Sequence, residues 1–195
     1  MKNNLQVIAS VLSLQSGYIR DPQMLAQFQT SKERIHSMAL IHEKLYQSSS
    51  LARIDMAEYV RSLTSMLVHT YHTHTSKVSL HLEIEPVSLN LDTAIPLGLM
   101  INELICNCLE HAFPDQRSGV ITVALRQAHD GRLTLTVEDT GVGLPKNLDW
   151  DNTQSLGLRL IRILAEQLHG TVGLRSHPGT AITLTTYELK AKERN

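Results

Sequence analysis

Apolar residues follow helical spacing through the first part of the chain. Between residues 3 and 19 they stand at positions 5, 8 and 12 and again at 7, 11, 14 and 18, which predicts a helix with a wide apolar face. Asp21 and Pro22 suit a helix cap and a first helical residue, so a second helix is predicted from there to about Tyr46. The short turn makes the two helices an antiparallel hairpin. Because a lone hairpin cannot bury both faces, we expect it to pair with a second copy as a four-helix bundle.

A small polar break, Ser48-Ser49-Ser50, predicts a boundary between two domains, 1–50 and 51–195. Asp55 and Glu58 then resemble a capping box at the start of a new helix. The pattern beyond it predicts a strand over 77–85, a long helix from Asp92 to about Phe113, strands at 119–127 and 132–139, a loop over 140–154, a helix at 156–168, and strands at 171–176 and 180–187. This order predicts an α+β chain: the hairpin, then a two-layer α/β sandwich whose mixed sheet has helices on one face.

Composition narrows the possible partners. The 195 residues are 42% hydrophobic and 19% charged with a formal net charge of -1, so a packed core is expected and bulk attraction to nucleic acid or anionic lipid is not. No apolar run approaches the roughly 20 residues of a membrane span, and no signal peptide is visible. We expect a cytoplasmic segment without membrane contact. Cys106 and Cys108 stand two apart on a predicted helix, so they cannot bridge each other and are expected to be reduced packing thiols.

Three polar residues share one side of the long predicted helix. Glu103, Asn107 and His111 are spaced i, i+4 and i+8, whereas Leu104 and Leu109 point elsewhere. A carboxylate, an amide and an imidazole on one face of an apolar helix are costly to bury without partners, which favours a ligand site. A solvated helix face explains this segment equally well when it is taken alone.

Three later segments combine glycine with polar residues. Asp139 to Gly143 read DTGVG at a strand end, where glycine lets the backbone approach a flat ligand. Residues 155–161 read SLGLRLI and begin a helix, whose free amide groups favour phosphate. Residues 178–180 read PGT at the penultimate turn. Each segment alone is also compatible with an ordinary turn or a Ser-capped packing helix.

Taken in order, NELxxNxxxHAF, DTGVG, SLGL and the final GT resemble the N, G1, G2 and Gly-Thr boxes of the Bergerat-type ATPase superfamily of gyrase, the heat-shock chaperone, histidine kinases and MutL. The resemblance covers residues 55–187 and implies Mg-ATP binding. Ser155 stands where many relatives have glycine, but the following Gly157 is kept.

The resemblance assigns roles to individual residues. Asn107 would coordinate Mg²⁺ between the phosphates, and Glu103 would be the carboxylate for acid/base or hydrogen-bonding work. Asp139 would accept a hydrogen bond from the adenine amino group, supported by Thr180. The other implied ATP-binding residues are His111, Gly141, Gly143, Ser155, Leu156, Gly157 and Leu158. Residues 144–154 would be the ATP lid, where Trp150 is either a partner contact or a packing residue.

The segments KNNLQVIASVLSLQ and RIHSMALIHEKLYQSSSLARID resemble the dimerisation and phosphoacceptor domain of one bacterial sensor histidine kinase subfamily, whose first helix carries His-Arg-hydrophobic-Lys-Asn-(Asn/Ser)-Leu-Gln. By that pattern the acceptor histidine would lie two residues before Met1. We expect His42 to pack inside the bundle and His36 to be solvated. His69, His72 and His74 are expected to form a polar surface.

The resemblance therefore implies a two-component histidine kinase core that phosphorylates a histidine in its dimer and passes the phosphoryl group to a response-regulator aspartate. The chain as given is expected not to autophosphorylate. The alternative is an ATP-binding, dimerising regulatory module without autokinase activity. A serine kinase of the anti-sigma type is a weaker alternative, because those kinases as a rule lack such a hairpin.

Overall fold

The protein is described here by a computed structural model covering residues 53–71, 77–145, 150, 153, 155–176 and 178–190, together with residues 14, 19–21, 24, 25 and 28. The chain divides into two compact units, Met1–Leu51 and Ala52–Asn195. In the first unit, the backbone N–H of Met24 donates to the Asp21 carboxylate (3.0 Å), as expected of a residue that caps a helix. The rest of the predicted hairpin, with His36 and His42, lies outside the described residues, as do His72 and His74.

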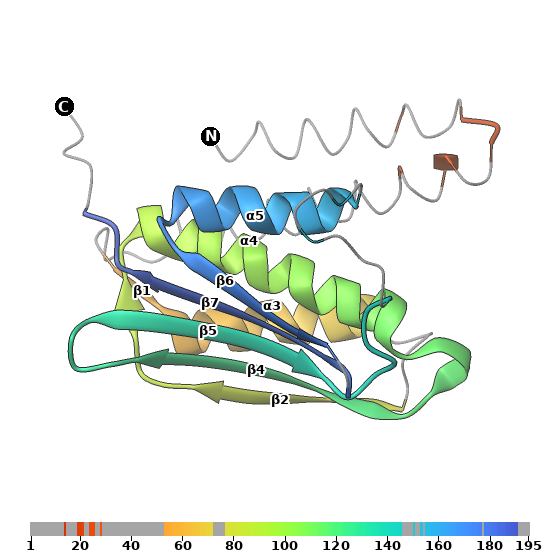
Figure 1. Ribbon diagram of the computed structural model, residues 1–195, viewed down its shortest axis with the longest axis horizontal. Helices are drawn as coiled ribbons and strands as arrows, with labels where there is room; N and C mark the ends of the chain where they lie inside the picture. The colour runs from red at the N-terminus through yellow and green to blue at the C-terminus, as the bar shows by residue number, and fades with distance from the viewer. Residues whose placement is uncertain are drawn as a thin grey trace. The chain divides into compact units, whose positions relative to one another are not determined.

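The second unit has two layers, a mixed sheet and the helices that cover one of its faces (Figure 1). Five strands form the sheet in the order β2-β4-β5-β7-β6. Their bounds are β2 Val78–Ile84, β4 Gly119–Gln127, β5 Arg132–Asp139, β6 Thr171–Ser176 and β7 Thr180–Tyr187. The β2–β4 pair is parallel and the other pairs are antiparallel. The predicted sandwich with a mixed sheet is confirmed.

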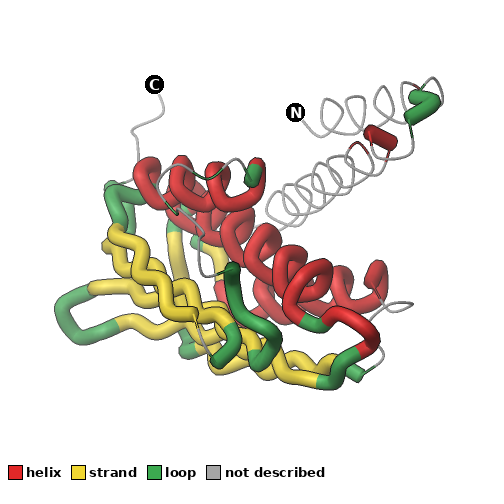
Figure 2. The backbone as a smooth tube through the Cα atoms, turned by 45° about the vertical axis from the view of Figure 1, so that its right-hand side comes forward, coloured by secondary structure: helices red, strands yellow, loops and turns green. Residues whose placement is uncertain are grey.

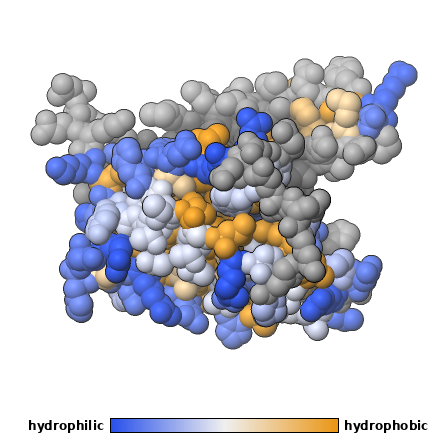
Figure 3. Space-filling view, in the orientation of Figure 1, coloured by the Kyte–Doolittle hydropathy of each residue, from blue (hydrophilic) through white to orange (hydrophobic). Residues whose placement is uncertain are grey.

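Three helices make up the other layer: α3 (Met56–Tyr71), α4 (Leu91–Asn107) and α5 (Leu156–Gln167) (Figure 2). The Asp55 carboxylate caps α3 by accepting the N–H groups of Ala57 and Glu58 at 2.8 and 3.1 Å. Strand residues alternate between the helical layer and the other face, so that Leu133, Leu135 and Val137 of β5 are buried. Apolar residues gather along the middle of the face seen in Figure 3, with hydrophilic residues around them.

Two features of the backbone were not predicted. A short antiparallel pair joins β1 (Ile54–Asp55) to β3 (Ser88–Leu89), before and after β2. The long helix was predicted as one α-helix to about Phe113, but its α-helical part ends at Asn107 and Cys108–Ala112 form a π-helical turn, η1. A π-turn carries one more residue per hydrogen-bonded ring than an α-turn and is frequent at functional sites.

Candidate functional site

The C-terminal half of α4 carries the three polar residues of the first motif, but at different depths. Glu103 is buried, with 1% of its surface exposed, Asn107 is half-buried, and His111 in the π-turn is exposed. Glu103 therefore lies in the interior, Asn107 on the wall of the pocket described below, and His111 at its rim. Asn107 and His111 share the expected face, because both line the pocket. Glu103 does not line it.

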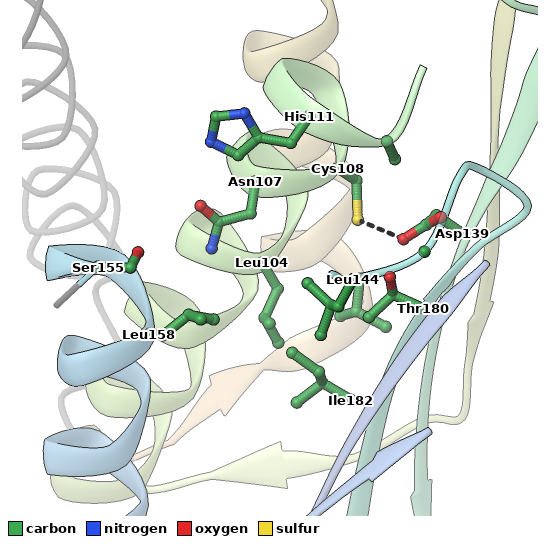
Figure 4. A pocket seen from close by; sticks show the side chains of 13 residues that line it. Leu104, Asn107, Cys108, His111, Asp139, Leu144, Ser155, Leu158, Thr180 and Ile182 are labelled. Carbon is green, nitrogen blue, oxygen red and sulfur yellow. Dashed lines mark hydrogen bonds between the residues drawn. The ribbon is translucent and has the colours of Figure 1, made fainter. Parts of the chain in front are cut away.

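A pocket opens between the end of α4, the start of α5 and the strand ends of β5 and β7 (Figure 4). Seven of the sequence-predicted site residues line it: Asn107, His111, Asp139, Gly143, Ser155, Leu158 and Thr180. Four do not reach its wall: Glu103, Gly141, Leu156 and Gly157. The pocket therefore brings together residues from all four motifs, which are distant in the sequence.

Five lining residues were not predicted, and four of them are apolar: Leu104, Cys108, Ala112, Val137 and Ile182. A sixth, Leu144, is the first residue of the predicted lid segment 144–154. Strand alternation could have found two of these, because Val137 shares a face with Asp139 and Ile182 shares one with Thr180. Their apolar side chains suit the flat face of a heterocyclic base.

Asp139 is the buried acidic residue of the pocket, with 3% of its surface exposed. Its Oδ1 accepts the backbone N–H of Gly141 at 2.7 Å, and its Oδ2 accepts the thiol of Cys108 at 3.6 Å. Thr180 pairs with Asp139 across β5 and β7, which sets both side chains at the same end of the sheet. The carboxylate is therefore fixed in place and presents an acceptor to the pocket.

The loop after Asp139 packs closely on the π-turn. A Cβ at Gly141 would lie 2.2 Å from the carbonyl oxygen of Ala112, which accepts the N–H of Val142 at 3.0 Å. Gly143 has a φ of 76°, in the left-handed region, and lines the pocket. Glycine is required at both positions, at one for space and at the other for the backbone angle.

The start of α5 lies against the α4 residues of the site. A Cβ at Gly157 would lie 2.2 Å from Oε1 of Glu103 and 3.3 Å from Nδ2 of Asn107. Ser155 is the N-cap residue but its side chain makes no capping hydrogen bond. The first N–H groups of a helix have no partner in the preceding turn, so this helix end is suited to bind an anion. Leu156 is 61% exposed and points away from the core.

Two polar groups on the π-turn side of the pocket differ in character. Nδ2 of Asn107 is buried and makes no hydrogen bond within the described part of the chain. Burial, the charge of Asp139 and the hydrogen bond to it raise the pKa of the Cys108 thiol well above its ordinary value. The thiol therefore keeps its proton and acts as a donor, whereas the Asn107 carboxamide is available to a ligand. Both cysteines are reduced and buried, as predicted.

The described residues hold no group of three or more His, Cys, Asp or Glu side chains that could bind a metal ion by themselves. Mg²⁺ usually keeps several waters and binds through one or two protein ligands together with substrate phosphates. The side-chain oxygen of a single carboxamide, such as that of Asn107 on the pocket wall, fits this mode. Among the described helices, none is both long enough and apolar enough to span a bilayer.

Comparison with known proteins gives two family matches. Residues 1–71 match the family model described as histidine kinase, and residues 92–190 match the model of histidine kinase-, DNA gyrase B-, and HSP90-like ATPases. The chain is 28% identical over 189 residues to blue-light-activated histidine kinase 2 of Erythrobacter litoralis, covering 94% of this chain and 54% of that protein. It is 30% identical over 192 residues to the sensor histidine kinase PdtaS of Mycobacterium tuberculosis, covering 94% of this chain and 37% of that protein.

Solved structures agree with the fold. The histidine kinase domain from the Erythrobacter litoralis EL346 blue-light activated histidine kinase aligns with a TM-score of 0.72 at 23% identity, covering 93% of this chain and 95% of that one. The chain spans about half or less of the length of the curated relatives it matches. The ATPase model covers more than half of the chain, and its match includes the four motifs and the pocket. The chain therefore belongs to the histidine kinase-, DNA gyrase B-, and HSP90-like ATPase family.

Proposed function

We propose that this chain is the Mg-ATP-binding core of a two-component sensor histidine kinase. The observation that carries the proposal is the polarity of the pocket from one end to the other. At one end, the buried Asp139 carboxylate faces an apolar wall, and at the other, the Asn107 carboxamide lies beside the N-terminus of α5. A purine nucleotide has the matching order of groups, a flat base with an amino donor followed by anionic phosphates.

In this orientation, Asp139 accepts a hydrogen bond from the adenine amino group, and Thr180 and Gly143 lie beside the base. The α5 backbone amides of Leu156, Gly157 and Leu158 bind the phosphates, and His111 lies at the phosphate end of the rim. Asn107 would hold Mg²⁺, which would supply charge neutralisation for the phosphates. Glu103 lies next to Gly157 and Asn107, where its carboxylate would serve acid/base or hydrogen-bonding work.

The reaction we infer is phosphoryl transfer, which needs positioning and charge neutralisation more than covalent work by the protein. A histidine imidazole nitrogen donates its electron pair to the γ-phosphorus, the bond to the bridging oxygen breaks, and ADP leaves. We assign the dimerising, phosphoacceptor-like role to the 1–50 region, with the acceptor histidine expected two residues before Met1, and the ATP-binding role to 51–195. An aspartate of a response regulator is the next acceptor.

Calorimetric titration with Mg-ATP tests the binding step. We expect saturable binding by the 195-residue chain and its loss in Asp139→Asn, which keeps the size of the side chain but replaces an acceptor oxygen with a donor. If the unmodified chain binds no Mg-ATP, the proposal is wrong.

A second assay tests the transfer step. It uses the protein with the His-Arg pair restored upstream of Met1 and measures acid-labile, base-stable phosphate. Binding of Mg-ATP without such labelling would favour a regulatory module over a kinase.

A further inference from the structure

The contact between Cys108 and Asp139 joins two elements that the sequence keeps 31 positions apart. Cys108 is the first residue of the π-turn, and its side chain points toward the Asp139 carboxylate at the end of β5 (Figure 4). Sγ lies 3.6 Å from Oδ2, within the range for a hydrogen bond to sulfur. Both residues line the same pocket.

The two oxygens of Asp139 are held by donors of different strength. Oδ1 accepts a backbone N–H at 2.7 Å from Gly141, which is part of the same tight turn. Oδ2 accepts only a thiol in the described part of the chain, and a thiol is a weak donor. A buried carboxylate oxygen without any donor is costly, so the thiol contributes to the stability of this arrangement. The hydrogen bond from the Cys108 thiol to Oδ2 is long. A stronger donor from a ligand can therefore share Oδ2 with the thiol, or replace the thiol, with little loss of stability.

We propose that Cys108 is a positioning residue for base recognition, whose thiol holds Oδ2 of Asp139 toward the pocket so that an exocyclic amino group meets an acceptor already in place. This inference rests on the proposed function, that the pocket binds ATP. Guanine has a carbonyl group where adenine has its amino group. In the same orientation, the guanine oxygen would face the Asp139 carboxylate, and neither group can donate a hydrogen bond to the other. A well-oriented Asp139 therefore favours adenine, and a carboxylate free to rotate discriminates less.

Cys106 offers a matched control on the same helix. It is a reduced, buried cysteine two residues earlier, but it does not line the pocket. Replacing either cysteine with alanine removes the same atoms from the interior. A general packing effect would therefore appear in both variants, whereas an effect on base selection is expected only for Cys108.

The test measures the Kd of Mg-ATP and Mg-GTP for the 195-residue chain by calorimetry. We expect Cys108→Ala to weaken ATP about tenfold, the size of a lost hydrogen bond to a charged group, while GTP changes little. Cys108→Ser restores a donor and should recover most of the ATP preference. Cys106→Ala should leave the ratio of the two Kd values as in the unmodified chain.

An ATP-to-GTP preference that is unchanged in Cys108→Ala, or that falls as far in Cys106→Ala, overturns the inference. If Cys108→Ala does not fold, Cys108→Val replaces it, because valine fills the volume and has no donor. Absence of ATP binding by the unmodified chain overturns the proposed function itself, whereas normal ATP binding with an unaffected Cys108→Ala overturns only the role of Cys108.

Discussion

The two ends of α4 meet the rest of the domain in different ways. At the N-terminal end, Asn90 accepts the N–H of Thr93 at 2.9 Å, donates its own backbone N–H to Glu188 at 2.8 Å and donates its side-chain amide to the Leu189 carbonyl at 2.5 Å. Arg53 also pairs with Glu188 at 2.9 Å. At the C-terminal end, the helix widens into a π-turn and the buried Nδ2 of Asn107 has no partner among the described residues.

The difference separates an asparagine whose polar groups are satisfied within the protein from one that we propose to bind a ligand. Asn90 satisfies its polar groups within the protein and so contributes to folding. The Asn107 amide is buried at a cost that the domain itself does not recover, which is expected where a ligand supplies the missing interactions. The predictions below test whether the two ends can be changed independently.

The largest effect is expected from Asn107→Ala. Loss of a direct metal ligand should weaken Mg-ATP binding by at least about 100-fold, measured by calorimetry with and without Mg²⁺. The free energy of unfolding should change little, because the amide has no protein partner to lose. Asn102→Ala is the control, since Asn102 is buried on the same helix but does not line the pocket. Equal weakening in both variants would contradict the distinction.

Asn90→Ala is the reverse experiment. Removing the cap and the bond to Leu189 should lower the free energy of unfolding by about 2 kcal/mol in urea denaturation. The folded protein should bind Mg-ATP with nearly the original affinity, because the pocket lies at the other end of the helix. If the Asn90→Ala variant is fully folded but binds Mg-ATP much more weakly, the two ends of α4 are coupled.

Gly157→Ala changes the packing between the start of α5 and the pocket end of α4. The added Cβ would lie 2.2 Å from the Glu103 carboxylate, so either the Glu103 side chain or the start of α5 must shift. We expect a loss of about 1.5 kcal/mol in unfolding free energy and weaker Mg-ATP binding. Gly173→Ala is the control, because its Cβ would meet only the Thr183 carbonyl oxygen at 3.9 Å. Similar destabilisation by both alanines would count against the close packing of Gly157 on Glu103.

The smallest effect is expected from Tyr59→Phe, a residue of α3 whose side chain lies against Gly98 in the middle of α4. The Tyr59 hydroxyl is buried against Gly98 and has no hydrogen-bond partner among the described residues. Its removal should leave stability unchanged or raise it by up to about 1 kcal/mol, measured by thermal unfolding. An unpartnered polar group away from the pocket would then be a structural cost and not a ligand signal.

The effect of Tyr59→Phe on stability should depend on pH. Burial raises the pKa of Tyr59 above its ordinary value of 10.0, so the hydroxyl ionises more readily in the unfolded chain. Below pH 10 this ionisation does not reduce the stability of the unmodified protein. As the pH rises above that value, its stability falls, because the ionised hydroxyl is favoured in the unfolded chain. The difference in stability between Tyr59→Phe and the unmodified protein should therefore grow in favour of the variant above pH 10. A constant difference across this range would contradict the assigned burial.

The fold was predictable because its strands alternate cleanly. The bounds of β4, β5, β6 and β7 agree with the predicted ranges, since apolar and polar residues alternate along them and turns separate them. The pair of β1 and β3 was missed, because two residues show no periodicity. The long helix ends close to the predicted Phe113, but its change from α-helical to π-helical turns after Asn107 was not predicted, because the two kinds of turn share the same apolar spacing over so few residues.

Local sequence patterns identified the motifs of the site, but they did not show how deeply each residue is buried. Glycine and polar residues marked the turns that meet at the pocket, because those positions need space or unusual backbone angles. That Cys108 faces Asp139 depends on the π-turn and on a contact across 31 positions, for which neighbouring residues give no signal.

The length of α4 makes its cap relevant to chemistry. With 17 residues, α4 is about 25 Å long, so a tilt of about 2° at the Asn90 end would carry Asn107 sideways by about 1 Å. A displacement of that size is enough to cost a phosphoryl-transfer enzyme about a hundredfold in rate. Two of the hydrogen bonds that limit such a tilt, from the backbone N–H of residue 90 to Glu188 and from the N–H of Leu189 to Thr93, remain in Asn90→Ala, so the helix keeps its direction in that variant.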